Sequence, residues 1–490
     1  MDRDANEDVC FRKGVTWSDL TSGRFSARLS PGGFAFDVKG SSAFPADIPL
    51  ALALLNSSFA NYALNLVNPT VSYQVGDIAR LPVPNHSGKS TQHLVEAAVS
   101  LARADSKEDE TTYDFVAPPE WPNGDAAIVK RHAKLVALEQ QVDEEVYKLY
   151  EISNEDRKAI EEELATPANT PDEGGEEEAD AGEDNGGSDP PCSITSVGLA
   201  REWVSYGVGV ALGRFFPGSS DALGHGELGS KVSERLKAMS DTGGIMVLED
   251  GHPDDLAQRV LNILHVIYED KGAEAIVRLA TEDDGPLRQG LDDYLQGQFF
   301  KWHVKLYRKR PIYWLLQSPK KKYSVYLFHE RATSDTLSRL QGKRYLGGKI
   351  HNAESELREA KQKETGASGR DKVIWSRRAR DLAELLDDLR AFDQRITAAN
   401  NVQIQDRDGR PVSVRWQPEP DDGVLLNASP LHDLAPAWKK ADSKLDLDRA
   451  WQDLGSGKYD WAKTAMRYWP QRVLKACKQN KSFSIAHGLM

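Results

Sequence analysis

Asn68 and Pro69 have the residue types of a base-modifying loop. Amino-methyltransferases for adenine use Asn or Asp, two prolines and an aromatic residue. The polar side chain and the first proline's carbonyl accept hydrogen bonds from the target amine, and the aromatic ring stacks on the flipped base. This sequence reads Asn68-Pro69-Thr70-Val71, so the second proline and the stacking ring are replaced. Because proline ends helical patterns, we interpret Asn68-Pro69 as a helix stop and not as a catalytic loop.

Gly207, Gly209 and Gly213 form a second pattern that is typical of cofactor loops. A dinucleotide or S-adenosylmethionine loop requires glycine at a strand-to-helix turn, where the backbone approaches the ligand. No run of four to eight strand-forming residues precedes these glycines. We therefore expect tight packing of a buried helix over residues 201–215, and no cofactor-binding residues in this chain.

Other catalytic patterns are also incomplete. Glu359-Ala360-Lys361 has the Glu-x-Lys spacing of a metal-dependent nuclease, but it lies in a charge-dense helical segment, where a solvated helix face is the favoured interpretation. The histidines form no metal-ligand pattern, and neither a phosphate-binding P-loop nor a G-x-S-x-G elbow occurs. We expect no catalytic residues and no metal ligands.

A basic module over residues 301–350 is the strongest candidate for a binding site. Thirteen Lys/Arg stand there against Glu330 and Asp335, a net charge of +11. The candidate DNA-binding residues within it are Lys301, Lys305, Arg308, Lys309, Arg310, Lys320, Lys321, Lys322, Arg331 and Arg344. Lys301, Lys305 and Arg308 are expected on one helical face, which suits contacts along a phosphate backbone.

Aromatic residues interleave with these cations, and two interpretations remain open. The aromatics Trp302, Tyr307, Tyr313, Trp314, Tyr323 and Tyr326 are typical either of a nucleic-acid surface or of a core with a basic rim. Composition alone favours neither, although the rings themselves are expected in the core more than against bases.

An acidic segment balances the basic module. Residues 151–190 hold fifteen Asp/Glu against Arg157 and Lys158, a net charge of −13, which equals that of the whole chain. Residues 166–192 show no apolar periodicity, so we expect an acidic disordered linker that acts as a solubilising spacer.

The elements that must position the basic module suggest a multidomain α+β protein. It should be predominantly helical with small β regions, and without a Rossmann methyltransferase core. Short strands are expected over 11–46, a single amphipathic helix over 49–66 and an extended segment over 71–84. Helices are expected over 91–103, 125–164, 253–270 and 287–306, a β-hairpin over 311–328, a helical hairpin over 352–400 with a break at 365–369, and a short strand over 412–416.

These elements give the following domain boundaries. We expect an α+β recognition-like module (1–90), a helical segment (91–165), the acidic linker (166–192), a helical domain (193–300), the basic β-hairpin module (301–350), the helical hairpin (351–400) and a C-terminal α/β cap (401–490).

Composition limits the class of protein and its cellular compartment. A chain of 490 residues with 40% hydrophobic and 28% charged residues is typical of several globular domains. Its three cysteines form neither a disulfide framework nor a zinc pattern, and no apolar run approaches the roughly 18 residues of a membrane span. We expect a cytoplasmic protein without a membrane partner.

Several long runs resemble one protein family. They are GVTWSDLTSGRFSARLSPGGFAFDVKGSSAFP (14–45), LALLNSSFANYALNLVNPTVSYQVGDIARLPVP (52–84), SYGVGVALGRF (205–215), RKRPIYWLLQSPKKKYSVYLFHERATSDTL (308–337), DDGVLLNASPL (421–431) and YDWAKTAMRYWPQRVLKACKQNKSFSIAHGL (459–489). Together they resemble the region after the catalytic domain in large adenine-specific DNA methyltransferases of the PglX type. That type belongs to BREX and phage-growth-limitation systems and is related to single-chain type IIG restriction-methylation enzymes.

The resemblance implies a function in two parts. In that family the cofactor loop and the Asn-Pro-Pro-aromatic loop lie N-terminal to the matching runs, so this chain resembles the C-terminal, target-recognition half of a split gene, a truncated gene or a fragment. The implied partners are double-stranded DNA and a methyltransferase catalytic domain or other phage-defence subunits. S-Adenosylmethionine is expected in the missing catalytic half, and Arg24, Arg28 and Lys39 are further DNA-binding candidates.

Two alternative functions belong to other functional classes. One is a non-catalytic scaffold or interaction protein of a phage-defence complex, which the helical hairpin and the acidic segment would favour. The other is a complete enzyme with a degenerate cofactor site near Asn68 or Gly207.

Overall fold

The structure, a computed structural model, describes residues 9–489 except 22, 37–38, 71, 85–87, 166–194, 220–221, 227, 241–242, 437 and 439–446. The predicted acidic linker at 166–192 therefore lies outside the described residues. Contacts divide the chain into two compact units, of which unit 1 comprises Met1–Asp109 with Pro119–Thr195 and unit 2 comprises Glu110–Pro118 with Ser196–Met490. We call Glu110–Pro118 the strap, because it belongs to unit 2 while both of its chain neighbours belong to unit 1.

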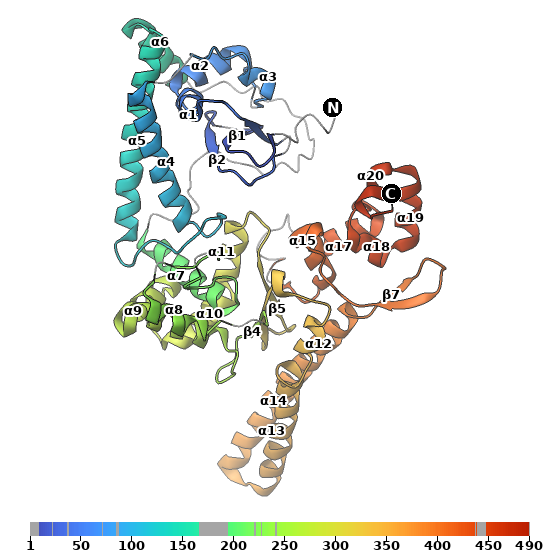
Figure 1. Ribbon diagram of the computed structural model, residues 1–490. Helices are drawn as coiled ribbons and strands as arrows, with labels where there is room; N and C mark the ends of the chain where they lie inside the picture. The colour runs from blue at the N-terminus through green and yellow to red at the C-terminus, as the bar shows by residue number, and fades with distance from the viewer. Residues whose placement is uncertain are drawn as a thin grey trace. The chain divides into compact units, whose positions relative to one another are not determined.

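The described residues of unit 1 form a small sheet and six helices (Figure 1). Its elements are β1 (Gly14–Ser18), β2 (Ala27–Ser30), β3 (Gly40–Ala43), α1 (Ile48–Leu55), α2 (Ser58–Val67), α3 (Val75–Ile78), α4 (Lys89–Glu108), α5 (Gly124–Leu149) and α6 (Asn154–Ala165). The sheet is antiparallel in the order β2-β1-β3, which confirms the predicted strands over 11–46.

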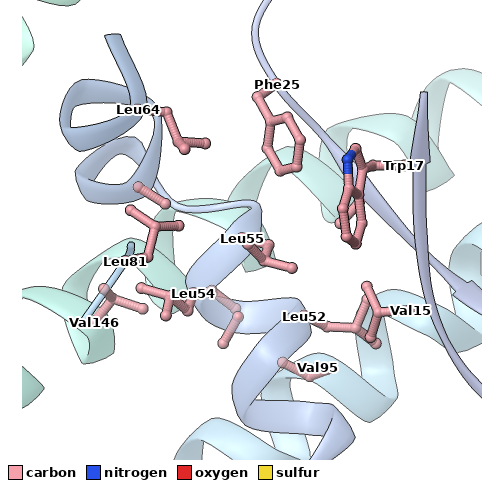
Figure 2. Close-up of a cluster of buried hydrophobic side chains, with 14 of the residues drawn as sticks. Val15, Trp17, Phe25, Leu52, Leu54, Leu55, Leu64, Leu81, Val95 and Val146 are labelled. Atoms are coloured by element: carbon pink, nitrogen blue, oxygen red, sulfur yellow. The ribbon is translucent and has the colours of Figure 1, made fainter. Parts of the chain in front are cut away.

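The core of unit 1 lies between the sheet and α1. Figure 2 shows Trp17 and Phe25 meeting Leu52 and Leu55 of α1 in one cluster of buried side chains. The Trp17 indole N–H donates to the carbonyl of Tyr73 at 3.0 Å, so the polar atom of this buried ring is satisfied.

The single helix predicted over 49–66 is wrong, because the chain forms α1 and α2 with a break at Asn56-Ser57. The Asn56 amide exchanges two hydrogen bonds with the backbone of Ala27 in β2, at 2.9 and 3.0 Å. Ser57 then caps α2 by accepting from the backbone of Ala60. Asn56, bonded to the sheet, thus ends α1, and Ser57 starts α2. The continuous apolar pattern of residues 49–66 gave no sign of this break.

The extended segment predicted over 71–84 is also wrong in part, since α3 occupies Val75–Ile78. The Asp77 carboxylate accepts from the backbone N–H of Gln74 at 3.1 Å and from the Asn68 amide at 2.8 Å. This capping carboxylate starts a short helix that apolar periodicity could not reveal.

Unit 2 is predominantly helical around one small sheet and a two-stranded ribbon (Figure 1). Its helices are α7 (Ser196–Ala211), α8 (Ser230–Lys237), α9 (Leu256–Thr281), α10 (Leu287–Gln296), α11 (Gln298–Leu306), α12 (Thr336–Leu340), α13 (Leu346–Gly366), α14 (Gly369–Ala399), α15 (Gly423–Ala428), α17 (Leu447–Ser456), α18 (Lys463–Tyr468), α19 (Pro470–Gln479) and α20 (Lys481–Ala486). Its strands are β4 (Ile245–Val247), β5 (Tyr313–Gln317), β6 (Ser324–Phe328), β7 (Val402–Gln405) and β8 (Pro411–Val414). The described residues thus confirm a predominantly helical α+β fold with small sheets.

The β5–β6 hairpin confirms the prediction over 311–328. It pairs Tyr313 with Phe328 through to Gln317 with Ser324, and β4 extends it to the antiparallel order β4-β6-β5. Every residue of the three strands is buried, so both faces of this sheet are covered. The hairpin is therefore the centre of the unit 2 core and not an exposed module.

Helices α13 and α14 lie side by side as a two-helix arm (Figure 1), with a break at Ala367-Ser368 that confirms the predicted helical hairpin. Their seam is narrow, with Ala360 of α13 packed against Ala379 and Leu382 of α14. Interhelical ion pairs flank it, among them Arg378 with Glu356 at 2.6 Å.

The strap is fixed inside unit 2. Phe115 is fully buried, and its ring lies 5.1 Å from that of Phe215. The backbone N–H groups of Gly224 and Gly226 donate to the carbonyls of Phe115 and Val116 at 2.9 and 3.0 Å. The strap thereby contributes the buried side chains of Glu110, Phe115, Val116 and Pro118 to unit 2.

Candidate nucleic-acid interface

The lysine turn, Ser318–Tyr323, connects β5 to β6 and carries Lys320, Lys321 and Lys322. The backbone of Ser318 and Tyr323 closes it with a hydrogen bond of 2.9 Å, and Lys321 N–H donates to the Ser318 carbonyl at 2.8 Å. Lys321 has a φ of 59°, in the left-handed region that residues other than glycine seldom adopt. A conformation of this kind persists only where the surroundings hold it.

A buried carboxylate holds the turn. Asp388 of α14 is 1% exposed and accepts from the Ser318 hydroxyl and from the backbone N–H groups of Lys320 and Lys322, at 2.7 and 3.3 Å for the two amides. Hydrogen bonds to an ionised acceptor are among the stronger ones in proteins. The backbone of the turn is therefore fixed, while its lysine side chains point outward.

The three lysines differ in their contacts. Lys322 lies 3.5 Å from the Glu384 carboxylate, an exposed pair that contributes little to stability. Lys320 and Lys321 are exposed and form no ion pair with any residue that the structure describes. These two ammonium groups are the cations of the turn that remain open to an anionic ligand.

The aromatic residues of the module lie mainly in the core. Tyr313, Trp314, Tyr323 and Tyr326 are at most 2% exposed, so their rings offer no face to a base. This confirms the expectation that the rings belong mainly to the core.

A second basic cluster, the α11 cluster, comprises Lys301 and Lys305 on α11 with Arg308, Lys309 and Arg310 in the loop that leads to β5. Lys301 and Lys305 are exposed one turn apart on α11, which confirms their common face, but the prediction for Arg308 is wrong because α11 ends at Leu306. The backbone turns at Arg308 and Lys309 with φ of 47° and 68°, ahead of Pro311, and carries these side chains off the helix.

Arg310 and Arg331 belong to the end of the hairpin opposite the lysine turn, where the His329 N–H donates to the Ile312 carbonyl at 3.0 Å. The Arg331 guanidinium lies 5.8 Å from the centre of the Phe216 ring. Because β5 has five residues, roughly 15 Å separates this end of the hairpin from the lysine turn.

Arg344 has a structural partner. Its guanidinium donates two hydrogen bonds to Asp254, at 2.6 and 2.7 Å, and Asp254 is 2% exposed. Burial opposes ionisation of Asp254, but the hydrogen bonds from Arg344 outweigh it and keep the pKa of this carboxyl below its ordinary value. The ion pair with Asp254 therefore accounts for an arginine at position 344 without a contact to nucleic acid.

A buried polar network supports the α11 end. The Arg214 side chain is 8% exposed, donates to the carbonyl of Glu110 in the strap at 3.2 Å and contacts the Tyr307 hydroxyl. Tyr307 in turn donates to the Glu110 carboxylate at 2.8 Å. Burial opposes charge on Arg214, but the surrounding tyrosine and glutamate oxygens raise its pKa above its ordinary value. Glu110 and Arg214 were not among the predicted site residues, because no local motif joins them to each other or to Tyr307.

His303 joins α11 to β5 beneath this network. The ring is fully buried, and its Nε2 accepts from the backbone N–H groups of Ile312 and Tyr313, both at 3.1 Å. Burial, and secondarily the charge of Arg214, keep the pKa of His303 well below its ordinary value. The histidine is thus a neutral acceptor.

Asp388 was also missed, although the sequence contains a signal for it. Asp388 follows Leu385 by three residues and precedes Phe392 by four, which places it on the apolar seam of α14. A carboxylate on such a seam needs buried partners, and the lysine turn supplies them.

The remaining candidates belong to unit 1. Arg24 and Arg28 are exposed, with Arg28 opposite Thr16 in the β1–β2 ladder. Lys39 pairs with Asp19 at 3.2 Å. Nothing in their surroundings singles out a nucleic acid, and their role stays a prediction.

The motifs set aside in the sequence have structural roles. Asn68 ends α2 and donates to the Ser72 carbonyl at 2.8 Å, so Asn68-Pro69 is a helix stop as predicted. A Cβ at Gly207 would lie 3.0 Å from Val260 of α9, and one at Gly209 would lie 2.2 Å from the Phe215 ring, which confirms tight packing of α7. Glu359 pairs with Lys363 on the surface of α13, as expected for a solvated helix face.

The described part of the chain offers neither a metal-ion site of several side chains nor a single helix able to cross a membrane. There, no group of three or more His, Cys, Asp or Glu side chains is arranged to hold a metal ion. Of the helices described, none is by itself long and apolar enough to cross a membrane, and α1 with α2, bent by 69°, reaches that composition only as a pair.

Known proteins provide two matches. The chain is 24% identical over 466 residues to the adenine-specific methyltransferase BrxX of Escherichia coli O9:H4 (strain HS), covering 88% of this chain and 36% of that protein. It is 27% identical over 444 residues to the adenine-specific methyltransferase PglX of Lacticaseibacillus casei (strain Zhang), covering 85% and 34%. No protein-family model matches. These alignments confirm the predicted relationship to PglX and BREX-type methyltransferases, and the chain spans about a third of the length of the two relatives.

Proposed function

We propose that this chain is the duplex-recognition part of a site-specific adenine-N6 DNA methyltransferase of the PglX type, working in phage defence. It grips the DNA backbone and presents the site to a methyltransferase domain that binds S-adenosylmethionine. The observation that carries the proposal is the lysine turn, in which adjacent exposed cations project from a backbone held by Asp388. Similarity to BrxX and PglX over most of the chain supports the choice of DNA as ligand.

The geometry of the two basic clusters suits a duplex. A fixed turn loses little conformational entropy when it binds, which favours affinity. The loop between α11 and β5, which carries Arg308, Lys309 and Arg310, lies roughly 15 Å from the lysine turn along the buried hairpin, a separation close to the 12 Å width of the DNA major groove. The two clusters can therefore contact phosphates on either side of one groove, with the rigid β4-β6-β5 sheet keeping their spacing constant.

The test is a salt titration of DNA binding by the full chain. Replacing Lys320, Lys321 and Lys322 with Ala should weaken binding to all duplex sequences alike. Because each phosphate contact contributes about 0.9 to the slope of log affinity against log salt, the slope should fall by up to about 3. Fluorescence anisotropy of a labelled duplex between 50 and 200 mM salt measures both quantities.

The matched control replaces Lys475, Lys478 and Lys481, which are exposed on α19 and α20, with Ala. This triple variant has the same net charge and should retain most of the slope. Equal losses in the two variants would mean that net charge alone attracts the DNA. Absence of salt-dependent binding by the unsubstituted chain would contradict the proposal.

A second candidate function is a scaffold that docks other defence subunits through the two-helix arm. Val373 and Ile374, near the break between α13 and α14, are 68% and 54% exposed, which is unusual for adjacent large apolar residues. Retention of a phage-defence partner by a chain that does not bind DNA would favour this candidate. Micromolar binding of S-adenosylmethionine by the chain alone, measured by calorimetry, would instead favour a complete enzyme.

A further inference from the structure

The β7–β8 ribbon is a two-stranded antiparallel hairpin that lies outside both basic clusters in sequence. Its register pairs Val402 with Val414, Gln403 with Ser413, Ile404 with Val412 and Gln405 with Pro411. Within the described part of the chain no third strand joins either edge. A single ribbon of this kind is marginal by itself, so it needs either support from one side or a ligand.

The support comes from one face only. Val402, Ile404, Val412 and Val414 are half-buried and alternate with exposed residues. Gln403, Ile404 and Gln405 together line an open groove of about 580 Å³ with Tyr468, Trp469 and neighbouring residues of α18 and α19. The Gln471 amide donates to the Asp406 carbonyl at 3.1 Å, which fixes the base of the ribbon turn to α19. The apolar face is therefore turned toward the protein.

The exposed positions of the ribbon carry mostly polar side chains. They include Gln403 and Gln405 on β7, which border the groove, with Ser413 on β8 and Arg415 just beyond that strand. Gln405 and Arg415 form no side-chain hydrogen bond or ion pair with the residues described, and the Gln403 amide has only a 3.5 Å contact to the Asn401 carbonyl. These exposed positions thus present two amides and a guanidinium, groups that can donate hydrogen bonds to a ligand.

The turn of the ribbon is preorganised. The Asp406 carboxylate accepts from the backbone N–H groups of Asp408 and Arg410, both at 2.8 Å, and Gly409 takes a φ of 80°. Arg407 and Arg410 project from this fixed turn, and both are exposed. Arg410 lies 3.7 Å from the Asp408 carboxylate in an exposed ion pair.

We propose that the β7–β8 ribbon enters the major groove of duplex DNA and that Gln403, Gln405 and Arg415 read base edges there. The major groove admits a two-stranded ribbon, Gln pairs with the N6 and N7 atoms of adenine, and Arg pairs with the O6 and N7 atoms of guanine. Side chains two residues apart on a strand are about 6.7 Å apart, which matches the rise over two base pairs. Gln403 and Gln405 thus address positions separated by two base pairs.

This inference rests on the proposed function and goes beyond it. The lysine turn and the α11 cluster hold phosphates and carry no sequence information, whereas the ribbon supplies it. The two roles predict different responses to mutation, because base contacts change sequence preference and phosphate contacts change the salt slope.

The experiment selects duplexes from a pool with randomised central base pairs, using the full chain and its Gln403→Ala/Gln405→Ala variant. The variant should keep the salt slope and its affinity for unselected duplex DNA, and should lose base preference at two positions two base pairs apart. The expected loss is about 5- to 150-fold at each position, the discrimination given by one good bidentate contact. The matched control is Gln362→Ala/Gln479→Ala, two exposed glutamines elsewhere in unit 2, which should behave as the unsubstituted chain does.

The outcomes separate the two proposals. Unchanged base preference in the ribbon variant would overturn the inference and leave the proposed function standing. Equal weakening on all sequences with a flatter salt slope would also overturn it, since the ribbon would then contact phosphates. Salt-dependent binding without any base preference in the unsubstituted chain would contradict the ribbon role alone, whereas no DNA binding at all would contradict both proposals.

Discussion

His303 shows how one side chain couples the core of unit 2 to pH. Its Nε2 accepts two backbone hydrogen bonds from the start of β5, so the folded protein holds the ring neutral. Burial keeps its pKa well below the ordinary value of 6.5. In the unfolded chain the same ring takes up a proton as the pH falls below about 6.5. The unfolded state then binds more protons than the folded state.

We therefore expect the stabilising effect of a neutral His303 to be fully present above about pH 6.5 and to be lost as the pH falls toward the folded-state pKa. The loss can reach about 1.4 kcal/mol per pH unit. His303→Gln should remove this contribution. Urea unfolding followed by tryptophan fluorescence at pH 7.5 and 5.0 measures the difference between the two proteins.

The control is His351→Gln, at an exposed position on α13 in the same unit. It should leave the pH dependence of the urea midpoint as it is in the unsubstituted protein. A parallel decline in His303→Gln and the unsubstituted protein would show that His303 takes up its proton without unfolding.

At the scale of elements, the lysine turn depends on a helix that is distant in sequence. Asp388→Asn keeps the size of the side chain but removes the charge and converts one acceptor into a donor. Since three donors of the turn point at this carboxylate, we expect the free energy of unfolding to fall by about 1–3 kcal/mol. Urea titration checks this value.

Asp387→Asn is the matched control, because Asp387 is the exposed neighbour and its replacement changes the net charge equally. Relative to Asp387→Asn, Asp388→Asn should also weaken DNA binding, as the lysines lose their fixed backbone. Equal stability and equal affinity in the two variants would mean that the turn keeps its shape without the carboxylate.

Periodicity and turn chemistry were sufficient to predict the β5–β6 hairpin, the two-helix arm and the helix stop at Asn68. They failed where a polar side chain bonds to a distant element. Asn56 breaks a continuous apolar stripe by hydrogen bonding to β2, and Asp77 starts α3 by capping it. The lysines of the candidate site could be found as a charge run, but Asp388, which shapes their turn, is specified by tertiary structure.

At the scale of the whole molecule, the strap belongs to unit 2 although the chain on both sides of it belongs to unit 1. Unit 2 contains nine residues that precede α5 of unit 1, and Phe115 packs within 5.1 Å of Phe215. We expect the chain to remain one particle when it is produced as two polypeptides, residues 1–180 and 181–490. The first polypeptide carries the strap, and the second carries the residues around it.

Co-expression with an affinity tag on the second polypeptide checks this expectation, since both should elute together. Phe115→Ala should weaken the association, because truncation of a fully buried aromatic ring removes about 3–5 kcal/mol of packing. The control is Tyr113→Ala, a 61% exposed ring in the same strap. Elution of the second polypeptide alone, with Phe115 intact, would contradict the expectation.

The strap also imposes an order on synthesis. Phe115 leaves the ribosome 100 residues before Phe215, the ring against which it packs. At 5–20 residues per second, that interval is roughly 5 to 20 s. During this time the helices of unit 1 can form on either side of a segment whose own core has not yet been translated. During synthesis the Phe115 ring thus waits for seconds before the residues that bury it in unit 2 exist.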